Sequence, residues 1–251
     1  MRWVMLVLLL ALPAKAEEVV AGLSQNRVAI TANFDGSEIL IYGAVKRQAP
    51  APLSDGPLQV IVTVAGPLEP ITVRRKSRQL GIWVNTSAVD VDAAPSFYAI
   101  NTSGPFSDVL LDVEDLRYHV SIPRAIRSVG APMDVADSSS FTDALIRIRQ
   151  SAELYQVNEN TVEISEETLF DTSITLPANL TEGEYTARIY LTRGGQVVDE
   201  HETVIHVQKV GLERWVYNLA HQRPLIYGIL SLAIAIAAGW LASAAFRVFR
   251  T

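Results

Sequence analysis

The chain has 251 residues, of which 49% are hydrophobic and 19% charged, with 21 lysine and arginine residues against 27 aspartate and glutamate residues. This composition is too apolar and too weakly charged for an intrinsically disordered chain. The formal net charge of −6 argues against a nucleic-acid-binding protein, because such proteins must neutralise phosphates. There is no cysteine, which excludes disulfides, thiolate metal sites and a cysteine nucleophile.

The first 16 residues have the three parts of a secretory signal peptide. Arg2 precedes an apolar run over residues 3–12, and the small-x-small pattern Ala14-Lys15-Ala16 follows it. The apolar run is shorter than the roughly 20 residues that a membrane-spanning helix needs. We therefore predict a signal peptide at residues 1–16 that is cleaved after Ala16; the alternative is an uncleaved anchor.

Residues 17–107 contain short runs in which apolar and polar residues alternate, as in strands with one buried face. Turn-forming sequences such as Asp55-Gly56-Pro57 and Gly66-Pro67 separate these runs. The predicted strands are residues 27–32, 38–43, 58–64, 71–75 and 82–84. Short alternating strands at this spacing predict a β-sandwich-like region rather than β-α-β units.

Residues 108–157 are predicted to be an insertion of helices and loops. Ser140-x-x-Asp143 is a variant of the capping box, which marks the start of a helix. The apolar residues that follow it at helical spacing are Phe141, Ala144, Leu145, Ile148, Ala152 and Tyr155. This pattern predicts an amphipathic helix of about 14 residues with one stripe facing the core. A second helix within residues 108–128 would be ended or kinked by Pro123.

Residues 158–210 are predicted to be an Ig-like β region. The spacing Leu180-x-x-Gly183-x-Tyr185 is that of a tyrosine corner, in which a tyrosine hydroxyl bonds to the backbone at the entry to strand F of an Ig-like sandwich. Gly194-Gly195 separates two alternating runs and predicts a hairpin. The predicted strands are residues 161–164, 169–176, 184–193 and 196–207. The fold class is therefore mainly β, with one or two Ig-like antiparallel sandwich units and an inserted helical segment.

Residues 224–246 contain no charged side chain and are long enough to cross a hydrocarbon core of roughly 30 Å as a helix. They predict one C-terminal transmembrane helix; the alternative is a buried helix of a soluble protein. The preceding residues 211–223 have an apolar helical face and predict an amphipathic juxtamembrane segment, plausibly continuous with the anchor. Residues 247–251 form the tail that follows.

The signal peptide and the anchor together predict the orientation of the chain. The region between them would be exported to the periplasm, and the transmembrane helix would stop transfer in the bacterial inner membrane, leaving residues 247–251 in the cytoplasm. Residues 17–223 hold 17 basic and all 27 acidic residues, a net charge of −10. The expected lipid partner is the inner membrane around the helix, because so acidic a domain will not lie flat on anionic headgroups.

Four segments of the chain carry a resemblance to a known family. They are Asn33-Phe34-x-Gly36 through Ile41-Tyr42-Gly43, Val73-Arg74-Arg75-Lys76 with Gly81-Ile82-Trp83-Val84-Asn85, Pro95-Ser96-Phe97-Tyr98, and Leu225-Ile226-Tyr227-Gly228. In these segments the chain resembles a family of alphaproteobacterial transmembrane proteins of similar length and layout. The resemblance implies an inner-membrane location and genetic proximity to permeases of the sulfite-exporter type. The family has no established activity, so no catalytic residue is carried over.

A basic run interrupts the acidic background and is the candidate ligand or partner surface. On a strand, Arg74 and Lys76 share one face, together with Arg78 if the strand continues, whereas Arg75 points to the other. The aromatic residues Trp83 and Tyr98 follow and are expected to complete a surface for an anionic ligand or a partner protein. The alternative is an edge strand that is protected by charge against edge-to-edge pairing.

Other groupings of reactive side chains favour structural roles. The four histidines are His119, His201, His206 and His221. His201 and His206 are five apart on one predicted strand and therefore face opposite sides. The carboxylates of Asp134, Asp137 and Asp143 could line a cation site, but they lack the spacing of a calcium loop, which favours solvated charges. We therefore expect no metal, no cofactor and no enzymatic activity.

Within the predicted anchor, small residues recur every fourth position and form a stripe that permits close packing of two helices. These residues are Ser231, Ala235, Gly239 and Ser243. The alternative is an ordinary alanine-rich membrane helix. Taken together, the features predict an accessory or interaction protein of the inner membrane with a periplasmic domain, whose partner could be a permease. The alternative function is a periplasmic module that binds or senses a small anion.

Overall fold

The computed structural model describes residues 17–31, 34–47, 56–128 and 137–249. The predicted signal peptide, residues 1–16, lies outside these ranges. The strands are β1 Glu17–Leu23, β2 Arg27–Ile30, β3 Ser37–Arg47, β4 Leu58–Ala65, β5 Leu68–Gln79, β6 Ile82–Pro95, β7 Tyr98–Thr102, β8 Tyr155–Asn158, β9 Glu163–Ser165, β10 Leu169–Leu176, β11 Gly183–Arg193 and β12 Gln196–Lys209. The helices are α1 Phe106–Val109, α2 Asp112–Tyr118, α3 Ile122–Ala125, α4 Ser139–Ser151, α5 Leu212–Gln222 and α6 Pro224–Phe249. The mainly β fold class with an inserted helical segment is confirmed.

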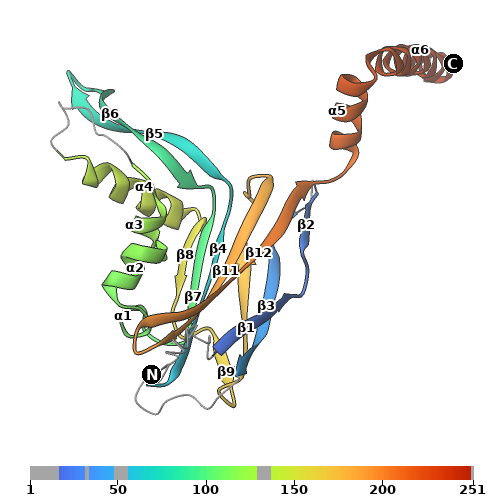
Figure 1. The fold of residues 1–251 in the computed structure, drawn as a ribbon. Coiled ribbons are helices and arrows are strands. Elements are labelled where there is room, and N and C mark those ends of the chain that lie inside the picture. The colour runs from blue at the N-terminus through green and yellow to red at the C-terminus, as the bar shows by residue number, and fades with distance from the viewer. Residues whose placement is uncertain (1–16, 32–33, 48–55, 129–136, 250–251) are drawn as a thin grey trace, which may run out of the picture. The chain divides into compact units, whose positions relative to one another are not determined.

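The strands form two larger sheets and one two-stranded ribbon (Figure 1). One sheet has the order β1-β3-β10-β9, the second has the order β2-β12-β11-β4-β7-β8, and the ribbon pairs β5 with β6. β3 pairs antiparallel with β10, and β4 pairs antiparallel with β11. The predicted β regions 17–107 and 158–210 therefore do not build separate sheets but contribute strands to the same two. β7 and β8 pair in parallel, whereas the other strand pairs named here are antiparallel, in agreement with a mainly antiparallel fold.

The six-stranded sheet is buried on both faces at its centre. Every residue of β7 is buried, and so are Ile61 and Thr63 of β4, between the alternating valines that the sequence pattern places in the core. On the inner face, Asn101 Nδ2 donates to Thr172 Oγ1 at 2.8 Å, which joins the two sheets. On the outer face, the α2–α3 segment covers the sheet (Figure 1): Tyr98 Oη donates to the Val120 carbonyl at 2.8 Å. Because helices cover this face, the central strands are buried on both sides, and their outward-pointing side chains need not be polar.

A buried ion cluster joins edge strand β1 and its neighbour β3 to β11 in the middle of the other sheet. Glu17 is the first residue of β1 and is 3% exposed. Arg193 of β11 donates from Nε to Glu17 Oε2 at 2.9 Å and from Nη2 to Oε1 at 2.8 Å, and Arg47 of β3 donates from Nε to Oε1 at 2.8 Å. The hydrogen bonds from Arg193 hold the pKa of Glu17 below its usual value, against the opposing effect of burial.

The tyrosine-corner hydrogen bond is present. Tyr185 is fully buried, and its hydroxyl donates to the Thr181 carbonyl at 2.8 Å. Two residues earlier, Gly183 has a φ of 156°, and a Cβ there would lie 2.9 Å from Pro67 Cγ. The predicted Gly194-Gly195 hairpin also forms, with φ of 54° and 78°, as a type I′ turn between β11 and β12 requires.

The helical insertion differs from the prediction in its details. Pro123 does not end a helix but lies in the first turn of α3, where a missing N–H costs nothing. At the start of α4, Ser140 is not the N-cap; its backbone N–H donates to Asp137 Oδ1 at 3.4 Å instead. α4 ends at Ser151, so Tyr155 of the predicted stripe belongs to β8, and Ile148 is 57% exposed.

The chain divides into two compact units, of which the second comprises residues 29–34 and 208–251. Within it, Val210 N donates to the Ile30 carbonyl at 2.8 Å. α5 covers almost the whole predicted juxtamembrane segment, but it is not continuous with α6, because Arg223 leaves helical geometry at φ −138° and ψ 64°. Pro224 begins α6, and proline disfavours helical geometry in the residue before it.

Candidate interaction surface

The predicted basic surface lies on the β5–β6 hairpin, whose strands are much longer than the alternating runs suggested. The two strands are joined at Leu80 and Gly81, which have φ of 50° and 89° as the two central residues of the turn. Positive φ is uncommon for a leucine, and Leu80 is fully exposed. The turn therefore exposes the apolar side chain of Leu80 to solvent.

Four of the five predicted surface residues share one face of this hairpin. In the register of the ribbon, Arg78 lies directly opposite Trp83 and Lys76 lies opposite Asn85. Residues two apart on a strand point to the same side, so Arg74, Lys76 and Arg78 line up beside Trp83. All four are exposed, Trp83 by 68%. Within the described ranges, no ion pair of Arg74, Lys76 or Arg78 with a carboxylate is found.

Arg75, on the opposite face, ties the hairpin to the start of α4. Its guanidinium carbon lies 4.5 Å from the centre of the Phe141 ring, and Nη2 lies 3.6 Å from Asp137 Oδ2. Nη2 also donates to Ser140 Oγ. Hydrogen bonds from Ser140 and Ser139, together with the charge of Arg75, hold the pKa of Asp137 below its usual value. The basic run thus divides into one structural arginine and three cations that remain available on the other face.

Tyr98 does not belong to this surface. It is 2% exposed, its hydroxyl is bonded to the Val120 carbonyl, and burial raises its pKa well above the usual range. The burial of Tyr98 could not be predicted from the sequence, because β7 is covered on both faces and carries no alternating pattern. In place of Tyr98, the tip of the hairpin adds Leu80 and Ile82, the latter 64% exposed. Exposed apolar side chains rimmed by cations are typical of interaction sites.

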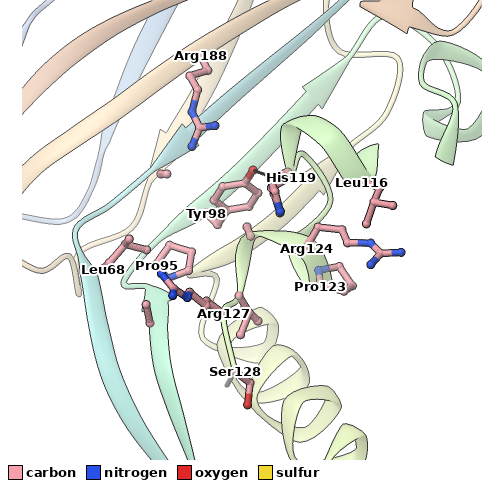
Figure 2. Close-up of a pocket in the computed structure, with 14 residues that line it drawn as sticks. Leu68, Pro95, Tyr98, Leu116, His119, Pro123, Arg124, Arg127, Ser128 and Arg188 are labelled. Carbon is pink, nitrogen blue, oxygen red and sulfur yellow. Dashed lines mark hydrogen bonds between the residues drawn. The ribbon is translucent and has the colours of Figure 1, made fainter. Parts of the chain in front are cut away.

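A cavity of about 570 Å³ that the sequence did not indicate lies against the outer face of the six-stranded sheet (Figure 2). It is lined by three arginines, Arg124, Arg127 and Arg188, together with His119 and Tyr98. Arg188 is far from Arg124 and Arg127 in the sequence, and the folding of α2 and α3 over the sheet places all three in the lining of one cavity. No sequence motif could have identified this group.

The remaining predicted groups lie apart from both features. Asp134 falls outside the described residues, Asp137 accepts a hydrogen bond from the backbone of Ser140 just before α4, and Asp143 is exposed. On β12, His201 lies opposite Ile189, and His206 Nδ1 is 3.7 Å from Glu184 Oε1.

α6 contains a candidate membrane span over Pro224–Ala244, long and apolar enough to cross a bilayer. All four residues of the small-residue stripe are exposed in the structure. These residues are Ser231, Ala235, Gly239 and Ser243. A Cβ added at Gly239 would meet no atom within 4 Å. Ser231 Oγ donates to the Gly228 carbonyl at 2.9 Å, which satisfies its hydroxyl within the helix.

Comparison with solved structures gives a weak likeness. The crystal structure of Spo0M, the sporulation control protein from Bacillus subtilis, is similar with a TM-score of 0.29 at 11% sequence identity. The likeness covers 82% of this chain and 55% of Spo0M, so this chain spans about half of that protein. So low a score supports no conclusion on fold or function.

No curated protein matches the chain. A family of membrane proteins does match, over residues 18–248, and its description is "Putative transmembrane protein (Alph_Pro_TM)". This match covers the β domain as well as the apolar helix. The chain therefore belongs to this transmembrane protein family.

Proposed function

We propose that the protein is a non-catalytic interaction protein of the bacterial inner membrane, held by α6, with its β domain in the periplasm. The observation that carries the proposal is the β5–β6 hairpin, whose exposed tip presents apolar side chains together with cations that form no ion pair with a carboxylate of the described residues. The orientation is supported by the sequence of residues 1–16, which has the three parts of a secretory signal peptide.

The strand order supports an Ig-like sandwich as the scaffold. In an Ig domain, one sheet holds strands A-B-E-D and the other holds G-F-C. If the letters A to G are given in chain order to β1, β3, β4, β9, β10, β11 and β12, the first sheet has the order A-B-E-D and the second contains G-F-C. The remaining strands, β2 and β5 to β8, are then additions to the Ig-like set. The tyrosine corner then falls at the start of strand F, where Ig domains carry it. In this assignment the β5–β6 hairpin is an insertion after strand C.

The partner that fits the tip of the hairpin is a membrane protein with an acidic rim around an apolar patch. Tryptophan and arginine are the residues most enriched among those that dominate binding energy. Arg78 and Trp83 are direct cross-strand neighbours, so a partner can contact both at once. The small-residue stripe of α6 offers the same partner a second contact inside the bilayer. A permease has both the extracytoplasmic loops and the membrane helices that this arrangement requires.

Site-directed photocrosslinking from the hairpin tip tests this proposal. A photoreactive amino acid at position 83 should form an adduct with a membrane protein in intact cells, and the same group at exposed Leu169 should not. The charge reversals Lys76→Glu and Arg78→Glu should abolish the adduct, whereas Arg147→Glu, an exposed arginine on α4, should leave it unchanged. Absence of an adduct at position 83, or equal adducts from both positions, would count against docking at the hairpin.

The stripe on α6 has its own test. Gly239→Ile places a branched side chain in the middle of the proposed packing face, and Ile236→Leu changes an exposed residue off the stripe as a control. We expect Gly239→Ile to weaken association with the partner in mild detergent and Ile236→Leu to leave it intact. Unchanged association of Gly239→Ile would remove this face from the proposal.

The alternative function is binding of a small anion by the same hairpin face, because Arg74 and Lys76 stand together with Trp83. Thermal shift of the protein with sulfite, sulfate and phosphate measures this directly. A stabilisation that Arg74→Ala abolishes would favour the alternative over protein docking.

A further inference from the structure

The cavity against the outer face of the six-stranded sheet concentrates positive charge in an otherwise acidic protein. Arg124 lies on α3, Arg127 follows that helix, and Arg188 comes from β11 on the opposite wall. None of the described residues that line the cavity is acidic. Glu202, the cross-strand neighbour of Arg188, is exposed, and no ion pair links the two in the described structure. The cavity is therefore an electropositive site with no carboxylate in its wall to neutralise it.

Arg188 has hydrogen-bonding capacity that the protein leaves unused. Its Nη1 donates to Tyr190 Oη at 3.2 Å, but its Nε is buried and has no acceptor among the described residues. Figure 2 shows the guanidinium directed toward the ring of Tyr98, along the cavity wall. A buried donor without a partner costs free energy, about 1–3 kcal/mol, so a native fold that keeps one calls for an explanation. An anion seated against Arg188 would supply the acceptor.

The backbone fixes the other donors in place. Arg127 exchanges two hydrogen bonds with Ala93, at 2.8 and 3.1 Å, which ties the residue to the end of β6. His119 ends α2 in a left-handed conformation with φ of 54°. Asp115 accepts hydrogen bonds from the backbone of Val120 and Ser121, which holds the turn between α2 and α3. The backbone of the segments that carry Arg127 and His119 is thus held in place beside the cavity.

The walls of the cavity are apolar as well as cationic. Leu68 and Leu116 are 64% and 55% exposed although they line it, and Pro95 and Ile126 extend the same surface. The volume is within the range of roughly 300–1,000 Å³ that is typical of small-molecule sites. We propose that this cavity binds an organic anion with an apolar body. Its charged head meets Arg188, its body covers the leucines, and Arg124 and Arg127 elsewhere in the lining add positive charge that attracts it.

Three probes separate the parts of this proposal. Naphthalene-2-sulfonate has both a permanent anionic head and an apolar body, naphthalene-2-sulfonamide has the same body without the charge, and sulfate has the charge without the body. Binding is measured by equilibrium dialysis of the full-length protein in lipid nanodiscs, with empty nanodiscs subtracted. We expect the sulfonate to bind at least about tenfold more tightly than either of the other two, as a charge-assisted hydrogen bond predicts.

Matched variants locate the binding. Arg188→Gln should weaken binding of the sulfonate by about tenfold or more. Arg124→Gln and Arg127→Gln change exposed side chains and should not affect folding. They should also weaken binding, so they provide the test if Arg188→Gln does not fold. Arg74→Gln, on the hairpin, should leave binding unchanged. Because the tip of the hairpin, with Arg74, Arg78 and Trp83, does not line the cavity, failure of this proposal is distinguishable from failure of the proposed docking function.

Each other outcome overturns the proposal. Equal binding of the sulfonamide would make the cavity a plain apolar site, and equal binding of sulfate would show that the apolar walls play no part. Binding that survives all three arginine substitutions, or no binding of the sulfonate by the wild-type protein, would remove the site.

Discussion

Arg193 and Glu17 lie 176 positions apart in the chain, yet they form a two-pronged ion pair in which the nitrogen–oxygen distances are 2.9 and 2.8 Å. Both side chains are buried, and Arg193 also donates to the Gly56 carbonyl at 2.7 Å. The pair joins the first strand of one sheet to the middle of the other. Correct pairing of the two sheets therefore depends on the residue that directly follows the predicted signal peptide.

Glu17→Gln should destabilise the domain strongly, because it leaves the charge of Arg193 buried without a counter-charge. Breaking a buried pair costs about 3 kcal/mol or more. Glu18→Gln is the matched control. Glu18 is 56% exposed, and its Oε2 lies 3.8 Å from Lys46 Nζ in a surface ion pair that contributes about 0.5 kcal/mol. Chemical denaturation of both variants measures the difference, and similar losses would contradict the role of Glu17.

The same carboxyl predicts how stability depends on pH. Its pKa in the folded protein is below the ordinary value of 4.5, so its contribution is full above that value and is lost as pH falls toward the folded pKa. Unfolding free energy should therefore fall more steeply below pH 4.5 in the wild type than in Glu17→Gln. Parallel curves for the two proteins would show that Glu17 is not the titrating group.

Tyr185→Phe removes the tyrosine-corner hydrogen bond and should cost about 1 kcal/mol of unfolding free energy. Tyr42→Phe serves as the control, because Tyr42 is 48% exposed. Burial raises the pKa of Tyr185 to about 12, so its stabilising contribution is complete below pH 10 and declines as pH rises toward 12. Equal stability of wild type and Tyr185→Phe at pH 7 would show that the corner is dispensable.

Gly43→Ala tests the close approach between β3 and β10. A Cβ at Gly43 would lie 2.4 Å from Phe170 Cζ and 2.8 Å from the Val20 carbonyl oxygen. Overpacking of this kind costs about 1–3 kcal/mol. Thermal unfolding should show the loss, and the second substitution Phe170→Leu should restore part of it. If Gly43→Ala unfolds like the wild type, the two strands are not packed as described.

Arg75→Gln separates the structural cation of the basic run from the exposed ones. Loss of the contact with Phe141 should cost about 0.5–1 kcal/mol and speed amide hydrogen exchange along β5 and β6. Arg74→Gln should change neither quantity. The opposite ranking of the two variants would reverse the assignment of faces on the hairpin.

The sequence predicted the strands that have one buried and one exposed face, because their residues alternate between apolar and polar. β3, β10 and β11 alternate clearly, and the glycines at the β11–β12 turn and the spacing before Tyr185 specify local geometry. β7 was missed because both of its faces are covered, so its residues do not alternate between apolar and polar.

The hairpin and the cavity show two other limits of sequence analysis. The pairing of Arg78 with Trp83 depends on a turn at Leu80 and Gly81, and a leucine is an unusual residue for it. The basic run was recognisable because its residues are adjacent, whereas Arg124 and Arg188 line the same cavity through tertiary packing alone. Tyr98 was misplaced for the same reason, since its burial depends on α2 and α3.

The central claim is that α6 anchors an exported domain, and the absence of cysteine in the chain allows a direct test. Single cysteines are introduced at Ser107, which is exposed on the β domain, and at Thr251 in the tail. Spheroplasts are treated with a membrane-impermeant maleimide before and after lysis. We predict that Ser107→Cys is labelled in intact spheroplasts and that Thr251→Cys is labelled only after lysis; labelling of Thr251→Cys alone in intact spheroplasts would contradict the account.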